Sequence, residues 1–312
     1  MSMWIGACTW PINWNPPYED AIKKVAELGF KSTELAIWNP EQIGTYYTPQ
    51  RTKDLRRLAE DLGLKITSVF YNLYGKGSPD AAVRAESVEN FKRGLDVLEQ
   101  LGCPLVNTHT AYPFDITFPN IFARPFEQEF SVDLPRGLDW KQNFEDQIDV
   151  LRQMAQACEA QGSIRMSIEP HPWRLVHNSA GMLRVIEHVQ SPAIGLNLDP
   201  SHLFPMGELA HMIAYEVGDR VFHTHFSDND GRTNVHWRPG KGQIDWHALV
   251  RALDDIGYSG PLSIELEDVP GSAGPTHRHR NPDYDPRIDR QMLLAKEYIE
   301  RVCEEEGVRL EK

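Results

Sequence analysis

Two patterns of apolar residues alternate along the chain. Short runs rich in β-branched and aromatic residues predict strands, and longer segments with apolar residues every three to four positions predict helices. The expected strands are residues 4–10, 32–38, 65–74, 105–110, 164–169, 194–198, 221–226 and 262–266. The expected helices are residues 18–28, 48–62, 80–101, 139–161, 179–190, 205–217, 244–256 and 287–306. A glycine directly after several of these helices marks their expected C-termini.

The regular alternation of strands and helices predicts an α/β protein with a parallel sheet. Eight strand–helix units favour a single closed (β/α)8 TIM barrel over an open doubly wound sheet, because no glycine fingerprint of a dinucleotide-binding unit follows the first strand. The length of 312 residues suits a barrel of ~250 residues with insertions. Since no linker interrupts the pattern, residues 1–312 are expected to form one domain.

Two segments break the alternation. Residues 112–138 follow the fourth strand, contain several prolines, and carry phenylalanines at every fourth position from Phe114 to Phe130. Residues 268–286 follow the eighth strand and are rich in glycine and proline. Because both segments follow the carboxyl ends of strands, they are expected to be insertions at the catalytic face of the barrel. An aromatic loop as long as the first is typical of a lid or of an arm that contacts a second chain.

The last four predicted strands each end on a side chain that can bind a metal ion. These side chains are Glu169, Asp199, His225 and Glu265, spaced 30, 26 and 40 residues apart, about one strand–helix unit each time. In a barrel the carboxyl ends of the strands converge on one mouth, so the four would surround one point. For any one of them a solvated residue at a loop edge is the plainer interpretation, but four in succession indicate a site. Three carboxylates and an imidazole suit Mn²⁺, Mg²⁺, Co²⁺ or Zn²⁺.

Such a site suits proton transfer at a carbon beside a carbonyl. The reaction needs a base and a means of stabilising the enediolate, and a chelated metal ion provides the second as a Lewis acid. Glu169 and Glu265, on the fifth and eighth strands, would address opposite faces of a planar enediolate. Two bases acting in turn invert a stereocentre, whereas one base alone isomerises. The residues leave both outcomes open.

Five segments, SIEPH, LNLDPSH, HTHFSD, PGKGQIDW and LSIELE, resemble the xylose isomerase-like TIM barrel superfamily. They are most similar to sugar phosphate isomerases and epimerases of the ketose 3-epimerase, hydroxypyruvate isomerase and inosose dehydratase type. The resemblance implies that Glu169, Asp199, His225 and Glu265 hold one divalent metal ion, with Mn²⁺ as the first expectation. It also implies that Glu169 and Glu265 are the acid/base pair and that His202 contacts substrate oxygens.

The resemblance also draws attention to the loop after the seventh strand. In the epimerases an arginine follows the strand-7 histidine by six residues. Here Gly231 occupies that position and Arg232 comes one residue later, so Arg232 is the candidate substrate clamp. His236 lies on the same loop and is a second candidate substrate contact.

Three further polar residues are candidates by position alone. His171 follows Glu169 by two residues and therefore points to the same side of an extended strand; it is a candidate base or substrate contact, or a rim residue. His109, near the end of the fourth strand, is a candidate substrate contact or a hydrogen-bonded histidine of the fold. Glu34 in the second strand is either a structural carboxylate or a substrate contact.

Two other functions fit part of the same pattern. Related barrels are 3-keto-sugar dehydratases, or C-glycoside-deglycosylating lyases with a small partner subunit, and they share the Glu-x-His pattern of Glu169 and His171. Endonuclease IV-like DNA-repair nucleases use the barrel with three zinc ions, but the third strand offers no histidine. Asn234 also stands where such nucleases have a zinc-ligating aspartate.

The composition narrows the choice of partner. The chain has 32 Lys and Arg against 45 Asp and Glu, a formal net charge of −13, which disfavours binding to nucleic acid and to anionic membranes. No signal peptide or membrane-spanning run is apparent, and the four cysteines lack CxxC spacing, so a cytoplasmic protein with reduced thiols is expected. The expected partner is a small-molecule sugar. The resemblance implies a homo-oligomer, a dimer or a tetramer.

Overall fold

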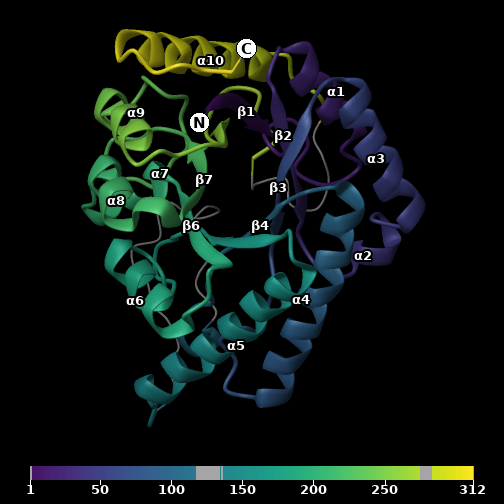
Figure 1. Ribbon diagram of the computed structural model, residues 1–312, viewed down its shortest axis with the longest axis vertical. Helices are drawn as coiled ribbons and strands as arrows, with labels where there is room; N and C mark the ends of the chain where they lie inside the picture. Colours follow the sequence, from purple (N-terminus) through teal and green to yellow (C-terminus); the bar gives the residue numbers. More distant parts are fainter. Residues whose placement is uncertain (1, 117–133, 135, 275–282, 312) are drawn as a thin grey trace.

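The protein is a closed barrel of eight parallel strands in chain order. The computed structural model describes residues 2–116, 134, 136–274 and 283–311, and Figure 1 shows the helices surrounding the strands. The strands are β1 (Trp4–Cys8), β2 (Ser32–Ile37), β3 (Lys65–Tyr71), β4 (Leu105–Thr108), β5 (Arg165–Ile168), β6 (Ile194–Leu198), β7 (Val221–Phe226) and β8 (Pro261–Ile264). Parallel pairing of β8 with β1 closes the ring. The expected (β/α)8 TIM barrel is therefore confirmed.

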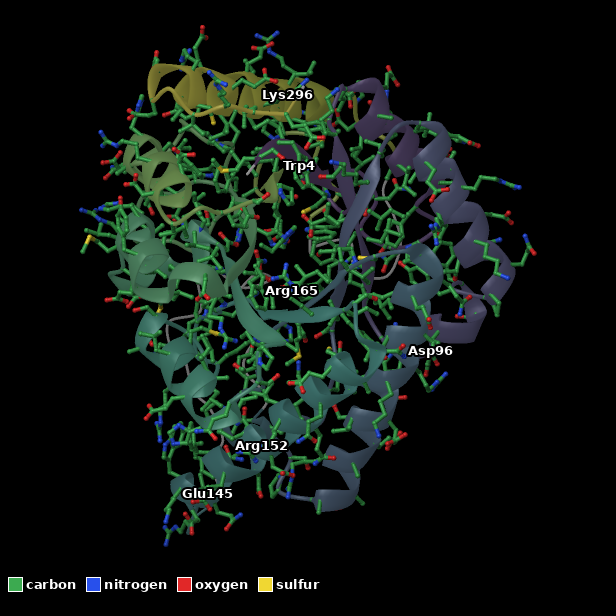
Figure 2. The ribbon with its side chains drawn as sticks, viewed as in Figure 1. Trp4, Asp96, Glu145, Arg152, Arg165 and Lys296 are labelled. Carbon is green, nitrogen blue, oxygen red and sulfur yellow. The ribbon has the colours of Figure 1, made fainter. Side chains whose placement is uncertain are left out.

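The helices form the outer layer. They are α1 (Glu19–Glu27), α2 (Gln42–Thr45), α3 (Pro49–Asp61), α4 (Ala81–Leu101), α5 (Trp140–Gln161), α6 (Ser179–Val189), α7 (Pro200–Leu203), α8 (Ala210–Val217), α9 (Trp246–Asp255) and α10 (Arg287–Glu305). Their outward faces carry charge, as Asp96 on α4 and Glu145 on α5 show (Figure 2). Their inward faces bury residues such as Phe91 and Leu98 against the barrel, as the amphipathic pattern predicts.

Local sequence signals define the ends of the long helices. Asp80 caps α4 by accepting a hydrogen bond from the Ala82 N–H at 2.8 Å, and Gly102 ends the helix with φ of 69°. Asp139 caps α5 in the same way through the Gln142 N–H. Such caps satisfy backbone groups that the helix itself leaves unpaired.

The segment after β6 differs from the prediction. The expected helix at 205–217 begins only at Ala210, where α8 starts, and α7 forms earlier, at Pro200. The Asp199 side chain accepts the Ser201 N–H at 2.7 Å and so begins α7. A 3-10 turn at Phe204–Met206 and Gly207 with φ of 83° then separate the two helices, because neither Pro205 nor this glycine suits a helix interior.

The interior of the barrel beneath its mouth is polar. Ser167 Oγ donates to Asn107 Oδ1 at 3.0 Å across the β4–β5 pair, and Asn197 on β6 is fully buried. Alternate residues of a strand share a face, so Glu169 stands above Ser167 and Asp199 above Asn197. The register of the barrel therefore directs the predicted ligands inward.

Parts of the expected insertions lie outside the described residues. Residues 117–133, 135 and 275–282 are among these, so the expected lid or arm at 112–138 and the insertion at 268–286 stay predictions. In the described part of the chain, no helix combines the length and the apolar composition needed to cross a membrane.

Candidate metal centre and active site

Four side chains from adjacent strands meet at the mouth of the barrel. Ligand atoms of Glu169, Asp199, His225 and Glu265 all lie within 4.8 Å of one another. Glu169, Asp199 and Glu265 directly follow β5, β6 and β8, and His225 belongs to β7. Each of the four is at most 6% exposed. The structure thus brings together the whole set of residues expected to hold a metal ion.

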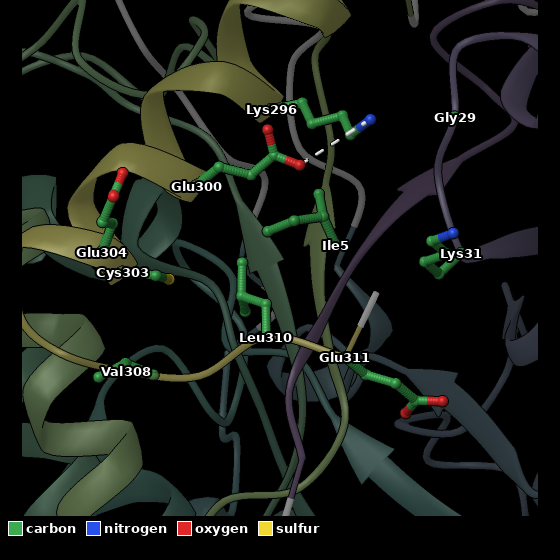
Figure 3. A pocket seen from close by; sticks show the side chains of 10 residues that line it. All are labelled: Ile5, Gly29, Lys31, Lys296, Glu300, Cys303, Glu304, Val308, Leu310 and Glu311. Atoms are coloured by element: carbon green, nitrogen blue, oxygen red, sulfur yellow. Dashed lines mark ion pairs between the residues drawn. The ribbon is translucent and has the colours of Figure 1, made fainter.

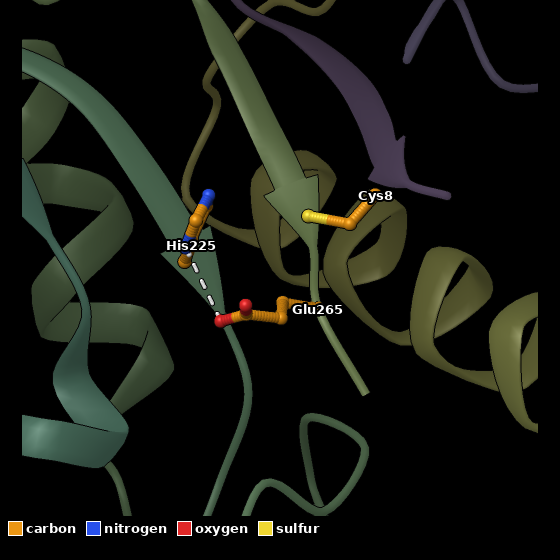
Figure 4. A group of neighbouring side chains, drawn as sticks. All are labelled: Cys8, His225 and Glu265. Atoms are coloured by element: carbon orange, nitrogen blue, oxygen red, sulfur yellow. Dashed lines mark ion pairs between the residues drawn. The ribbon is translucent and has the colours of Figure 1, made fainter. Parts of the chain in front are cut away.

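Three of the atoms that face the centre of this cluster lack hydrogen-bond partners among the described residues. They are Asp199 Oδ2, His225 Nδ1 and Glu265 Oε2. Glu169 Oε1 lies 2.5 Å and Glu265 Oε2 3.2 Å from His225 Nδ1, and Figure 4 marks the second contact. Burying a polar atom without a hydrogen-bond partner costs free energy. A bound cation would remove this cost, because the oxygen and imidazole lone pairs that face one another would all coordinate it. The residues present therefore fit a divalent metal ion.

The electrostatics of the cluster are those of a site with excess negative charge. Burial lowers the pKa of His225, but the carboxylates of Glu265, Glu169 and Glu34 outweigh burial and hold that pKa well above its usual value. Burial raises the pKa of Asp199, and the charges of Glu265 and Glu169 add to this rise. Without a metal ion the cluster thus tends to hold protons, which a divalent cation would replace.

Four histidines lie in a row along one side of the cluster. The ring centroids are 5.3 Å apart for His109 and His171, 3.7 Å for His171 and His202, and 4.7 Å for His202 and His236. All four are predicted candidates for contact with the substrate or for proton transfer, and they come from the segments after β4, β5, β6 and β7. We call them the histidine row.

Three members of the histidine row contact the proposed metal ligands. His171 Nε2 lies 3.2 Å from Glu169 Oε2. His202 Nε2 and His236 Nε2 lie 3.6 and 3.5 Å from Asp199 Oδ2. Burial lowers the pKa values of His109 and His202 well below the usual value, so both rings are neutral.

The other two candidates occupy different positions. Glu34 is fully buried and its carboxylate contacts His223, His225, Ser68 and Ser263. It therefore lies beneath the metal cluster, away from the mouth. Arg232 is exposed on the loop after β7 and is not among the side chains that converge on the cluster.

Two site residues were missed by sequence reasoning. Trp10 Nε1 donates to Glu265 Oε1 at 2.8 Å, and Asn197 Nδ2 donates to Glu169 Oε1 at 2.9 Å. Asn197 precedes Asp199 by two residues, so strand alternation was a usable signal for it. Trp10 follows β1, and nothing in the sequence pairs it with the residue after β8.

A separate pocket lies at the opposite end of the barrel. It has a volume of about 510 Å³ and lies between the amino ends of β1 and β2 and one side of α10 (Figure 3). Ile5, Val308 and Leu310 line it together with charged residues such as Lys31 and Lys296. None of the candidate site residues lines this pocket, so it is not part of the metal centre.

Comparisons with known proteins agree with this architecture. A family model for the xylose isomerase-like TIM barrel matches residues 22–296. Fructoselysine 3-epimerase from Escherichia coli O157:H7 is 23% identical over 261 residues, 80% of this chain and 86% of the epimerase. Inosose dehydratase from Geobacillus thermodenitrificans is 22% identical over 306 residues, 92% of this chain and 90% of the dehydratase. The structure of D-psicose 3-epimerase with D-tagatose from Clostridium cellulolyticum H10 has a TM-score of 0.75 at 21% identity, and the match covers 97% of this chain and 99% of the epimerase.

Proposed function

Because the chain belongs to the xylose isomerase-like TIM barrel family, we propose that it is a divalent-metal-dependent sugar isomerase or epimerase. Its substrate would be a ketose or a related keto sugar. The observation that carries the proposal is the convergence of Glu169, Asp199, His225 and Glu265 on one buried point. Orphaned ligand atoms at that point are hard to explain in a protein without a metal ion.

Those four residues would hold the ion, with Mn²⁺ as the first candidate and Mg²⁺, Co²⁺ or Zn²⁺ as others. A bound divalent ion would supply Lewis-acid stabilisation of the negative charge that develops on a carbonyl oxygen. The chain's own residues would do the rest, which is to bind the sugar, orient it and move the proton.

The histidine row is suited to binding and orienting hydroxyl groups. His202 Nδ1 lies 2.9 Å from Asn234 Oδ1, so the amide oxygen fixes the ring tautomer with the proton on Nδ1 and leaves Nε2 as an acceptor. A neutral ring held in this way can accept a hydrogen bond from a sugar hydroxyl. We propose His109, His202 and His236 as substrate contacts.

Proton transfer would use the two glutamates on opposite sides of the cluster. Glu169 and Glu265 each direct one oxygen at the metal position and hold the other in a defined contact, with His171 and Trp10 respectively. A base on each side of the substrate allows abstraction from one face and return to the other. Epimerisation follows if both act, and isomerisation if one does.

The contact between His171 and Glu169 favours a second candidate, elimination from a 3-keto sugar. The His171 side chain is 24% exposed against 3% for Glu169, so the imidazole is the more accessible base. Glu169 would orient it through the Oε2 contact. A single base that abstracts a proton beside a ketone can be followed by loss of a β leaving group, and inosose dehydratase is among the relatives.

Solvent deuterium exchange tests both candidates. The purified protein with Mn²⁺ would be incubated in D₂O with a panel of free ketoses and 3-keto glycosides. Deuterium in recovered sugar supports the isomerase or epimerase, whereas release of a leaving group supports the lyase. If no sugar exchanges or reacts, and Glu169→Gln behaves like the wild type, the proposal is wrong.

A further inference from the structure

The carboxylate of Glu34 lies directly beneath the proposed metal centre without facing the substrate. Glu34 lies on β2 and is fully buried, and its Oε2 is 3.2 Å from His225 Nε2. The other ring nitrogen, His225 Nδ1, faces the carboxylates of Glu169 and Glu265. One imidazole thus stands between a buried carboxylate and the cluster of proposed ligands.

We propose that Glu34 is a positioning residue that presents the Nδ1 lone pair of His225 to the metal ion. The inference rests on the proposed function, because it requires the metal centre. A neutral imidazole carries one N–H, and the nitrogen beside a carboxylate oxygen keeps it. Glu34 therefore holds the proton on Nε2 and leaves Nδ1 free to bind the cation.

The Glu34 side chain is itself held by donors from three other strands of the barrel. Ser68 Oγ on β3 donates to Oε2 at 2.6 Å, and Ser263 Oγ on β8 donates to Oε1. His223 Nε2 on β7 lies 2.9 Å from Oε1. This many donors on one buried carboxylate fix its position and favour its ionised form. The orientation of His225 is therefore set by the barrel wall and does not depend on a mobile loop.

The neighbouring thiol provides a matched control. Cys8 on β1 is fully buried, and its Sγ lies 3.6 Å from Glu34 Oε1; Figure 4 shows it beside His225 and Glu265. The thiol contacts Oε1 of the same carboxylate, whereas His225 faces Oε2, and Sγ also lies within 4.8 Å of a His225 ring nitrogen. Cys8→Ser keeps a donor of similar size at this position and leaves the Glu34 carboxylate in place, so it should leave the His225 tautomer unchanged.

The test is metal affinity, measured by calorimetric titration of Mn²⁺ into the metal-free full-length protein. In Glu34→Gln an amide replaces the charge, and its N–H group competes for His225 Nε2, which favours the tautomer with the proton on Nδ1. The dissociation constant is expected to rise by about 10- to 100-fold, as for other supporting groups of metal ligands. Cys8→Ser should bind Mn²⁺ like the wild type, and thermal unfolding in chelator verifies that both variants are folded.

A second measurement needs no variant. In the Zn²⁺-loaded wild-type protein, ¹⁵N NMR of the His225 ring should show the proton on Nε2. A proton on Nδ1 would overturn the role of Glu34. So would wild-type Mn²⁺ affinity in Glu34→Gln, provided that Glu169→Gln has lost Mn²⁺ binding. Either result would leave the proposed metal centre itself unaffected. Absence of binding of any divalent ion by the wild type would instead contradict the proposed function.

Discussion

At the scale of single residues, the proposed chemistry depends on which atom of each side chain is left free. Glu169 offers Oε1 to the cluster and Oε2 to His171. Glu265 offers Oε2 to the cluster and holds Oε1 against Trp10. The two carboxylates differ on both sides. Asn197 donates to the cluster-facing oxygen of Glu169, whereas that of Glu265 has no hydrogen-bond partner among the described residues. The outer partner of Glu169 is an imidazole that can accept or give a proton, and that of Glu265 is an indole that can only donate a hydrogen bond.

Glu169→Gln is expected to remove both metal binding and proton transfer. The amide is nearly the same size as the carboxylate but lacks its charge and basicity. Solvent exchange should fall by about 10²–10⁴-fold, the usual contribution of a positioned acid or base. Deuterium incorporation measured by mass spectrometry checks this, with Glu145→Gln on the exposed face of α5 as the control. Exchange within a few-fold of wild type would rule out Glu169 as a base.

Trp10→Phe is expected to slow the reaction if Glu265 takes part in proton transfer. The change removes the indole donor to Glu265 Oε1, and hydrogen bonds to charged groups contribute about 1.5–3 kcal/mol. The rate should fall on the order of 10- to 100-fold, most of it in kcat. Trp14→Phe is the matched control, because the Trp14 ring stacks on Trp38 with centroids 4.4 Å apart, and Trp38 also contacts Trp10. Equal effects of the two changes would show a packing role only.

At the scale of secondary structure, the strands were easier to predict than the segments that follow them. All eight strands lie where runs of β-branched and aromatic residues predicted them, because the outward side of each strand packs against helices and stays apolar even where the inward side is polar, as at Ser167 and Asn197. The predicted third strand was too long, since it was extended to residue 74 and ends at Tyr71. The helix expected at 205–217 began too early because its apolar residues continue through Pro205 and Gly207, where the backbone cannot stay helical.

The same reasoning explains which site residues could be predicted. Glu169, Asp199, His225 and Glu265 follow from strand order alone, since carboxyl ends of adjacent strands must meet. Contacts between distant strands, such as Trp10 with Glu265, depend on the closure of the barrel between β1 and β8. No local pattern encodes that closure. That Glu34 lies beneath the mouth and not in it likewise depends on its depth within the barrel, which the residue type does not indicate.

The loop between β3 and α4 holds a buried lysine whose ionisation should be visible in stability. Lys76 is 2% exposed and donates to Thr108 Oγ1 at 3.0 Å and to the His109 carbonyl. Burial lowers the pKa of Lys76 well below its usual value, and the charge of Arg174 lowers it further. Below the usual lysine value of about 10.4, the unfolded chain therefore binds more protons here than the folded one, and stability rises with pH.

Lys76→Met should remove this rise. The free energy of unfolding of the wild type minus that of Lys76→Met is expected to increase between pH 7 and pH 9.5, measured by urea unfolding. Lys241→Met is the matched control, because Lys241 also stands between two glycines but is exposed. A difference that stays constant with pH for Lys76→Met would show that the lysine is equally charged in both states.

At the scale of the whole molecule, all ligands of the proposed metal centre belong to the second half of the barrel. Its ligands lie on or directly after β5, β6, β7 and β8, whereas the part of the chain from β1 to β4 contributes aromatic and supporting residues such as Trp10 and Glu34. The three carboxylates at the mouth give the second half of the barrel a cluster of like charges, and three of the four ligands have a buried atom without a hydrogen-bond partner among the described residues. A bound cation should therefore stabilise the folded state, in addition to the negative charge that develops during the reaction.

The metal ion is expected to raise thermal stability at a stoichiometry of one per chain. A ligand that binds only the folded state contributes about 2.7 kcal/mol at a concentration 100 times its dissociation constant. Unfolding of the chelated protein should therefore shift upward on addition of Mn²⁺, and Asp199→Asn should abolish most of the shift because it removes a ligand that is fully buried. Asp228→Asn is the control, since that buried carboxylate accepts hydrogen bonds from Gly240, Ile244 and Trp246 and should lower stability with and without metal alike. Three tightly bound zinc ions per chain would instead favour a nuclease, because His202 and His236 would then bind metal ions together with Asp199 and would not bind a sugar.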